Sequence, residues 1–199
     1  MVALLNRVHR YVPGNQGDFR YVMLTLLVVP IRWTRQHGWR QPTDSEVEAA
    51  TRFFRELGDR MHISGLPETF GEAEAILDAY EAKHVAPSAA GHALMDATVR
   101  ILRETLPGPA RPLTRTILSV MFDDDRLTDA LGLPRRRKLT AAALNAVLAV
   151  RNVRKRSRPL PSRPRFSPGH SGSTQYPSGY ALSDLGPEHV MGSEDRSRV

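Results

Sequence analysis

The chain has 199 residues, of which 41% are hydrophobic and 25% are charged, as expected for one soluble globular domain rather than two. It contains no cysteine, which excludes disulfides, thiolate nucleophiles and cysteine-ligated metal sites. The net charge of +7 is unevenly spread, because residues 135–168 hold eleven Lys or Arg and no Asp or Glu, whereas residues 1–134 hold 15 basic and 17 acidic residues. The basic excess therefore belongs to the C-terminal part of the chain.

A basic segment of this kind can bind an anionic surface, and residues Arg135–Arg165 are the candidate for such binding. Nucleic acid is a less favoured partner, because the segment lacks interleaved aromatic residues and a known reading module. A solvated tail is the favoured interpretation. The start of the chain shows no secretory signal, and with the absence of cysteine this predicts a cytoplasmic location.

The N-terminal third predicts a short opening helix, a turn-rich break over residues 12–17, and a long buried helix over residues 19–37. Asp18 is the expected cap of the long helix, and Pro30 is expected to kink or end it. The apolar run inside this helix is shorter than the roughly 20 residues that span a bilayer. We therefore expect a core helix and no transmembrane segment.

Helical periodicity continues to about residue 156. Two capping boxes, Thr43 with Glu46 and Thr69 with Glu72, open the next two helices, and Ser88 opens a third. Shorter helices are expected over residues 113–122 and 124–131, and an alanine-rich helix from Thr140 onward. The sequence thus predicts an all-α domain of about seven helices over residues 1–156. Residues 157–199 are rich in Pro, Ser and Arg and are predicted to be disordered.

No self-sufficient catalytic motif is present: the chain has no P-loop, GxGxxG, GxSxG or HExxH pattern. The run Asp123-Asp124-Asp125 could ligate a hard cation. Consecutive residues do not share a helix face, however, and this run stands where a helix should begin. Stabilisation of a helix N-terminus is the favoured role.

Among seven histidines, His9 is the one whose position invites a functional hypothesis, because it lies just before a tight loop and the most buried helix. A hydrogen-bonded structural histidine is the favoured interpretation from the residues alone. Tyr21 and Thr25 are one turn apart and can point into one pocket. Arg40 is a further candidate, although a tie between the Gly38-Trp39 corner and a helix C-terminus suits it better than contact with a substrate.

Residues 5–135 resemble the MpaB and rubber oxygenase catalytic-domain family. The motifs that carry the resemblance follow one another in order: Arg7-Val8-His9, Asp18-Phe19-Arg20-Tyr21, Pro30-Ile31-Arg32-Trp33, Gly38-Trp39-Arg40, Thr43-x-x-Glu46, Pro67-Glu68-Thr69 and Tyr80-Glu81.

The resemblance implies a helical haem-dependent oxygenase that acts on an apolar small molecule such as an isoprenoid. It places the axial ligand of haem b at His9, and it makes Tyr21, Thr25 and Arg40 candidates for the catalytic site. Several positions depart from the family. Only eight residues precede His9, so we expect a chain that is N-terminally shortened, and Pro13 and His62 stand where arginine and glycine are common. The alternative is a helical interaction protein that has kept the fold without the activity.

Overall fold

A computed structural model describes residues 2–122, 124–135 and 138–157. These residues contain eight α-helices, one 3-10 helix and no strand, which confirms the all-α prediction. The helices are α1 (Val2–His9), α2 (Gln16–His37), α3 (Asp44–Arg60), α4 (Phe70–His84), α5 (Ala89–Thr105), η1 (Gly108–Leu113), α6 (Thr114–Met121), α7 (Asp125–Ala130) and α8 (Lys138–Arg156). The predicted disordered tail, apart from Ser157, lies outside the described residues.

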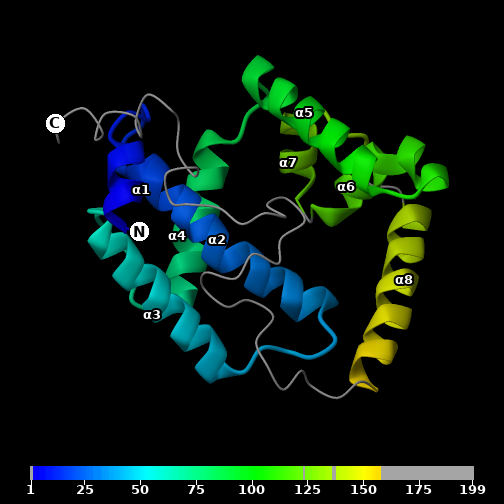
Figure 1. The fold of residues 1–199 in the computed structure, drawn as a ribbon, viewed down its shortest axis with the longest axis horizontal. Helices are drawn as coiled ribbons and strands as arrows, with labels where there is room; N and C mark the ends of the chain where they lie inside the picture. The colour runs from blue at the N-terminus through cyan, green and yellow to red at the C-terminus, as the bar shows by residue number, and fades with distance from the viewer. Residues whose placement is uncertain (1, 123, 136–137, 158–199) are drawn as a thin grey trace, which may run out of the picture.

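Helix α2 is the central element (Figure 1), and it packs against both α3 and α4. It begins earlier than predicted, because Asn15 rather than Asp18 is the N-cap residue. The Asn15 side chain accepts from the backbone N–H of Asp18 at 3.1 Å, and the Asp18 carboxylate accepts from the backbone N–H of Asn15 at 3.0 Å. This reciprocal pairing satisfies two amide groups that the first turn of the helix leaves free. Asp18 thus closes a capping box instead of acting as the cap.

Helix α2 also does not end at Pro30, since it continues seven residues further to His37. Pro30 is exposed, and its own carbonyl accepts a hydrogen bond from Oγ1 of Thr34 at 2.7 Å. Proline removes one intrahelical hydrogen bond but does not prevent packing of the buried face. Burial of Leu24, Leu27 and Val28 on that face, each at most 2% exposed, keeps the helix continuous.

The predicted capping boxes are confirmed for α3 and half confirmed for α4. Thr43 and Glu46 form the complete box at the start of α3. Thr69 accepts from the backbone N–H of Glu72, but the Glu72 carboxylate accepts from the backbone N–H of Glu68 instead of Thr69. Ser88 caps α5 as predicted.

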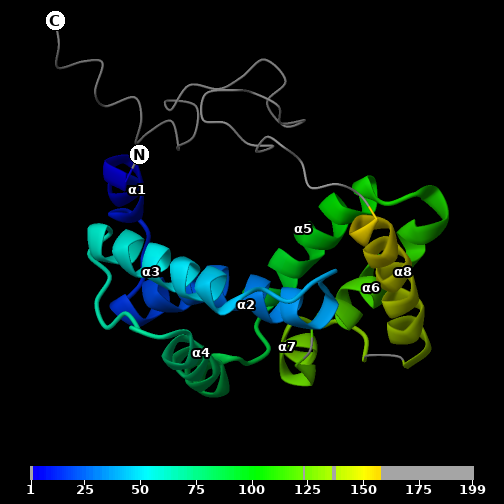
Figure 2. The ribbon, with the colours of Figure 1, turned by 90° about the horizontal axis from the view of Figure 1, so that it is seen from below.

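The hydrophobic core has two parts. The first joins α2 to α4 and contains Leu24, Leu27, Val28, Ala73 and Leu77. The second joins α5, α6 and the segment after α7, and contains Met95, Leu118 and Leu133. Figure 2 shows α1, α3 and α4 at one end of the molecule and α5, α6 and α8 at the other, with α2 between them. Residues from both ends therefore meet along α2.

Candidate functional site

A cleft of about 800 Å³ lies where these two ends meet. Helices α2 and α4 form one side of it, and the segment from the end of α6 to the residue after α7 forms the other. Its apolar lining residues are Val29, Trp33, Leu77, Met121, Phe122, Leu127 and Leu131. A space of this volume and lining suits an apolar small molecule.

Tyr21 and Thr25 both line the cleft, so the structure brings these two predicted residues together. The hydroxyl of Thr25 donates to the carbonyl of Val22 in its own helix at 2.7 Å. The hydroxyl of Tyr21 donates to Oε1 of Glu81 on α4 at 3.3 Å, and the Tyr21 ring stacks on Tyr80 with ring centroids 4.5 Å apart. Tyr21 is thus held in place on two sides.

Tyr21 and Glu81, which pair at the cleft, both have raised pKa values. Burial, with a smaller effect from the Glu81 carboxylate, raises the pKa of Tyr21 to about 12. Burial also raises the pKa of Glu81, and the nearby carboxylates of Asp78 and Asp124 add to this. At neutral pH the Tyr21 phenol therefore remains a hydrogen-bond donor.

Charges at the rim of the cleft are paired. The guanidinium of Arg32 donates to Glu74 at 2.9 Å and to both carboxylate oxygens of Asp78 at 2.7 and 2.9 Å. These bonds lower the pKa of Asp78 and raise that of Arg32. Because Asp78 is used in this pair, it is not a free ligand for a cation.

The acidic run before α7 behaves as a helix cap. Asp124 is the N-cap residue of α7, and its carboxylate accepts from the backbone N–H of Arg126 at 2.8 Å and from the Arg126 side chain at 2.7 Å. This confirms the capping role for Asp124, while Asp123 is outside the described residues. Within the described part of the chain, no group of three or more His, Asp or Glu residues is arranged to hold a metal ion.

His9 lies apart from the cleft. It is the last residue of α1, it is half-buried, and its ring packs against Phe19 with centroids 5.6 Å apart. Residues two positions apart on an α-helix are about 200° apart around its axis. Phe19 therefore faces away from the side of α2 on which Tyr21 lines the cleft.

Arg40 lies in a different, smaller pocket of about 240 Å³ near the start of α3. Its guanidinium donates to both carboxylate oxygens of Glu46 at 2.6 and 2.7 Å, and it lies over the Trp39 ring at 5.6 Å. Arg40 links the Gly38-Trp39 corner to a helix, as expected. The link is to the N-terminus of α3, however, and not to a helix C-terminus. The acid that closes the α3 capping box is what attracts the arginine there.

Sequence comparison places this arrangement among known proteins. The family described as "ER-bound oxygenase mpaB/B'/Rubber oxygenase, catalytic domain" matches residues 3–153. The chain belongs to this family. The MpaB and rubber oxygenase resemblance is thereby confirmed over most of the described residues.

One curated relative is the "ER-bound oxygenase mpaB'" of Penicillium brevicompactum, which is 26% identical over an alignment of 236 positions including gaps. The alignment covers 88% of this chain and 56% of the relative, so the chain spans about half of that protein's length. No solved structure gives a significant match. Among the described residues of this family member, no helix has the length and apolar character required to cross a bilayer.

The cleft lining does not by itself fit a haem. A b-type haem needs an axial ligand beside an apolar slot, and none of the described lining residues is a histidine. One buried imidazole nitrogen without a described hydrogen-bond partner is Nε2 of His37, whose ring packs on Trp33 with centroids 4.1 Å apart. Asn152 of α8 donates to the His37 carbonyl at 2.9 Å. The described cleft lining itself thus offers no imidazole ligand for a haem iron.

Sequence reasoning missed the partners of the predicted residues. Arg32 of α2 and Tyr80 and Glu81 of α4 stand within the motifs that carry the family resemblance, yet nothing in their spacing shows that the two helices meet through these side chains. Tyr80 stacks on Tyr21 on one side and on His84 on the other, and its hydroxyl donates to Asp18. The apolar position of Leu77 beside these residues was the one available signal that this face of α4 turns inward.

Proposed function

We propose that this chain is an oxygenase domain whose apolar small-molecule substrate occupies the cleft beside Tyr21 and Thr25. Membership of an oxygenase family supports the reaction class. The cleft of about 800 Å³, in which seven of the fourteen lining residues are apolar, is the observation that carries the substrate class. An isoprenoid chain suits such a lining, because branched hydrocarbon units fill an aliphatic and aromatic wall without needing polar partners.

Within this proposal Tyr21 is the polar group that orients the substrate. Its phenol stays protonated at neutral pH, and the Tyr80 stack fixes its ring. The Tyr21 proton is directed at Glu81, so its oxygen is a fixed acceptor at one edge of the apolar wall, and it can position the hydroxyl end of a prenyl alcohol. Thr25 has committed its proton to the Val22 carbonyl, so it offers the cleft only an acceptor.

Fluorescence of Trp33, which lines the cleft, tests the substrate site. A Trp39→Phe background leaves Trp33 as the single tryptophan, and a prenyl alcohol is then titrated into the protein. We expect saturable quenching that Val29→Asp weakens at least tenfold. The matched control is Val22→Asp, since Val22 is an equally exposed valine of α2 that is absent from the lining. An equal loss of prenyl-alcohol affinity in Val29→Asp and Val22→Asp would argue against the cleft as the substrate site. Absence of Trp33 quenching in the parent would do the same.

Haem b with His9 as axial ligand is a separate proposal that rests on the family resemblance. The His9 ring has no described hydrogen-bond partner and is half-buried, so its nitrogens are available to a metal. An absorption spectrum after haem supplementation tests it, with His84→Ala as the control because His84 is exposed and stacks only on Tyr80. A stoichiometric Soret band that disappears in His9→Ala alone supports the proposal.

The separation of His9 from the cleft favours one alternative, a non-catalytic helical interaction protein. In that case neither the parent chain nor the His84→Ala variant binds haem stoichiometrically. The predicted cytoplasmic location belongs to the same set of proposals, and localisation of a tagged chain in cells tests it.

A further inference from the structure

Helix α8 has an inner face that attaches it to the fold. Its half-buried residues are Thr140, Ala141, Leu144, Leu148 and Asn152, and the helix packs against α6 and α2. Side chains of Asn152 and Arg156 donate to the carbonyls of His37 and Trp39 at 2.9 and 3.0 Å. One side of α8 is therefore held against the rest of the fold, and the opposite side faces outward.

The outer face of α8 carries a continuous apolar stripe. Its residues follow one another at spacings of four and three, which places them on one side of a helix: Leu139, Ala143, Ala146, Val150 and Val153. All are exposed, with 86% of Leu139, 56% of Val150 and 64% of Val153 accessible. Scattered exposed apolar residues are ordinary, but a continuous stripe of them marks an interaction surface.

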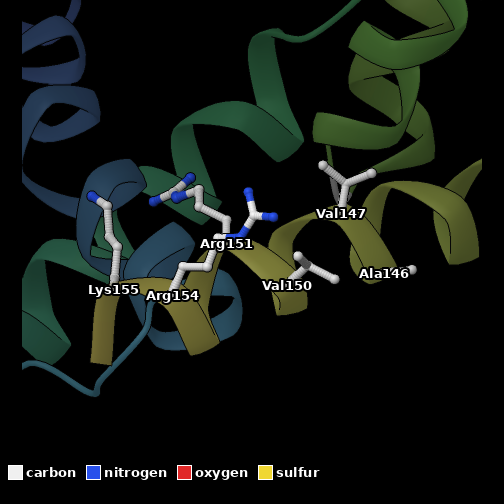
Figure 3. A pocket seen from close by; sticks show the side chains of 6 residues that line it. All are labelled: Ala146, Val147, Val150, Arg151, Arg154 and Lys155. Carbon is white, nitrogen blue, oxygen red and sulfur yellow. The ribbon is translucent and has the colours of Figure 1, made fainter. Parts of the chain in front are cut away.

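The charges on α8 have one sign. Its 19 residues include Lys138, Arg151, Arg154, Lys155 and Arg156 and no acidic residue. Figure 3 shows three of these cations on the same stretch of helix as Val147 and Val150, around a hollow of about 510 Å³. Arg154 borders the apolar stripe, four positions after Val150, whereas Arg151 and Lys155 lie on the side of the half-buried Leu148, three and seven positions after it. All three cations are exposed, so their long side chains can reach headgroups beside the stripe.

We propose that the outer face of α8 docks onto an anionic lipid surface. The valines and Leu139 would enter the boundary between headgroups and acyl chains, and the cations that follow them would pair with lipid phosphates and carboxylates. This arrangement needs no membrane-spanning helix. The inference does not depend on the oxygenase activity proposed above.

The charges and the apolar stripe of α8 favour an anionic bilayer over a second copy of the chain and over nucleic acid. In a parallel pair of α8 helices from two copies, the cations at residues 151–156 would meet one another, and in either orientation the second helix offers no acidic residue to pair with them. Nucleic acid would match the cations, but phosphate and base contacts leave an aliphatic stripe without a role. An anionic bilayer matches both features.

Co-sedimentation of the full chain with vesicles tests the proposal. Phosphatidylcholine vesicles are compared with vesicles that also contain about a third phosphatidylserine. We expect binding to the anionic vesicles only, with a large loss between about 0.1 M and about 1 M salt as the Debye length falls from about 10 to about 3 Å. Each cation near the surface should contribute about fivefold to the partition coefficient.

Three variants identify the face. Arg151→Glu with Arg154→Glu should reduce partitioning by about 25-fold or more. The control is Arg52→Glu with Arg55→Glu, which makes the same charge change on the exposed side of α3 and should have a much smaller effect. Val150→Trp should instead increase binding, in protein whose circular dichroism spectrum and vesicle-free sedimentation match those of the parent.

Several results would overturn the inference. These are absence of binding to anionic vesicles, equal losses in the α8 and α3 charge variants, or unchanged binding of Val150→Trp. A dimer in light scattering that Val150→Asp converts to a monomer would assign the face to a second copy. Salt-dependent binding to RNA or DNA, with no vesicle binding, would assign it to nucleic acid.

Discussion

His62 is the only non-glycine residue with a positive φ, 59°, among those that the structure describes. It follows the C-cap of α3, where the backbone N–H of Ile63 donates to the Gly58 carbonyl at 2.9 Å and that of His62 to the Asp59 carbonyl at 3.0 Å. This pattern is a Schellman motif, whose left-handed position favours glycine. The structure thus gives a physical reason for the glycine that is common there in the family.

We predict that His62→Gly raises the free energy of unfolding by about 0.5–1 kcal/mol, because it relieves the left-handed backbone. Chemical denaturation measures the effect. Gly132 at the end of α7 is the matched site, with a φ of 65° and the same two hydrogen bonds. Gly132→Ala should destabilise the protein, and a stabilising effect there would contradict the argument.

Arg40 and Glu46 give a prediction about pH. Side-chain hydrogen bonds from Arg40, with a further bond from the Thr43 backbone, lower the pKa of Glu46 from 4.5 to about 2. A lowered carboxyl pKa stabilises the folded state above the unfolded value, and this contribution is lost as the pH falls from 4.5 toward 2. Arg40→Ala should therefore raise the pKa of Glu46 in an NMR titration.

The thermal midpoint of Arg40→Ala should accordingly lie below that of the parent at neutral pH and approach it near pH 2. Arg55→Ala, at an exposed position within α3, should leave the Glu46 titration unchanged. An unchanged Glu46 titration in Arg40→Ala would show that the ion pair does not form in solution.

The pKa of Glu81 is shifted upward, in the opposite direction to that of Glu46. Because burial raises its pKa, the folded state binds this proton more tightly than the unfolded state, and stability falls as the pH rises through the folded pKa. Glu81→Gln keeps an acceptor for Tyr21 and removes the charge. We expect it to stabilise the protein by about 0.5 kcal/mol near pH 8 and to have no effect near pH 4, allowing for partial exposure.

Denaturant titrations at the two pH values measure this difference, with Glu104→Gln on the exposed side of α5 as the control. Stabilisation of equal size at both pH values would contradict the burial argument, since it would not depend on ionisation.

At the scale of the elements, the sequence predicted most helices because their ends carry local signals. Thr43, Thr69, Ser88 and Asp124 each cap a helix through their side chains, as expected. The wrong cap is at α2, where Asn15 replaces Asp18 because its side chain forms a local capping box with Asp18. Burial of the inner face of α2 keeps the helix continuous past Pro30, against the local preference of proline.

Pro30 should still cost stability. Its ring removes one hydrogen bond inside α2, and the residue is exposed, so alanine would restore the bond without altering the core. We predict that Pro30→Ala raises the free energy of unfolding by about 1–3 kcal/mol in urea denaturation. Pro87→Ala, in the connection between α4 and α5, should be neutral or destabilising. No gain from Pro30→Ala would mean that α2 already compensates for the missing bond.

At the scale of the whole molecule, the site was predictable only where its residues share one helix. Tyr21 and Thr25 could be paired from their spacing, and the structure places both at the cleft. Glu81, Phe122 and Leu131 reach the same cleft from distant segments, which no local pattern reveals. The sequence also could not show that His9 and Arg40 lie elsewhere, because that depends on how α1 and α3 pack around α2.

The central claim is that this chain is an oxygenase domain acting on an apolar molecule in the cleft. Its most direct test is incubation of the haem-supplemented full chain with a prenyl alcohol under isotopically labelled dioxygen, followed by mass spectrometry of the products. The account predicts labelled oxygen in a product, with the yield strongly reduced in Val29→Asp and retained in Val22→Asp. Absence of label from every product, in protein that shows a stoichiometric Soret band and saturable quenching of Trp33, would contradict it.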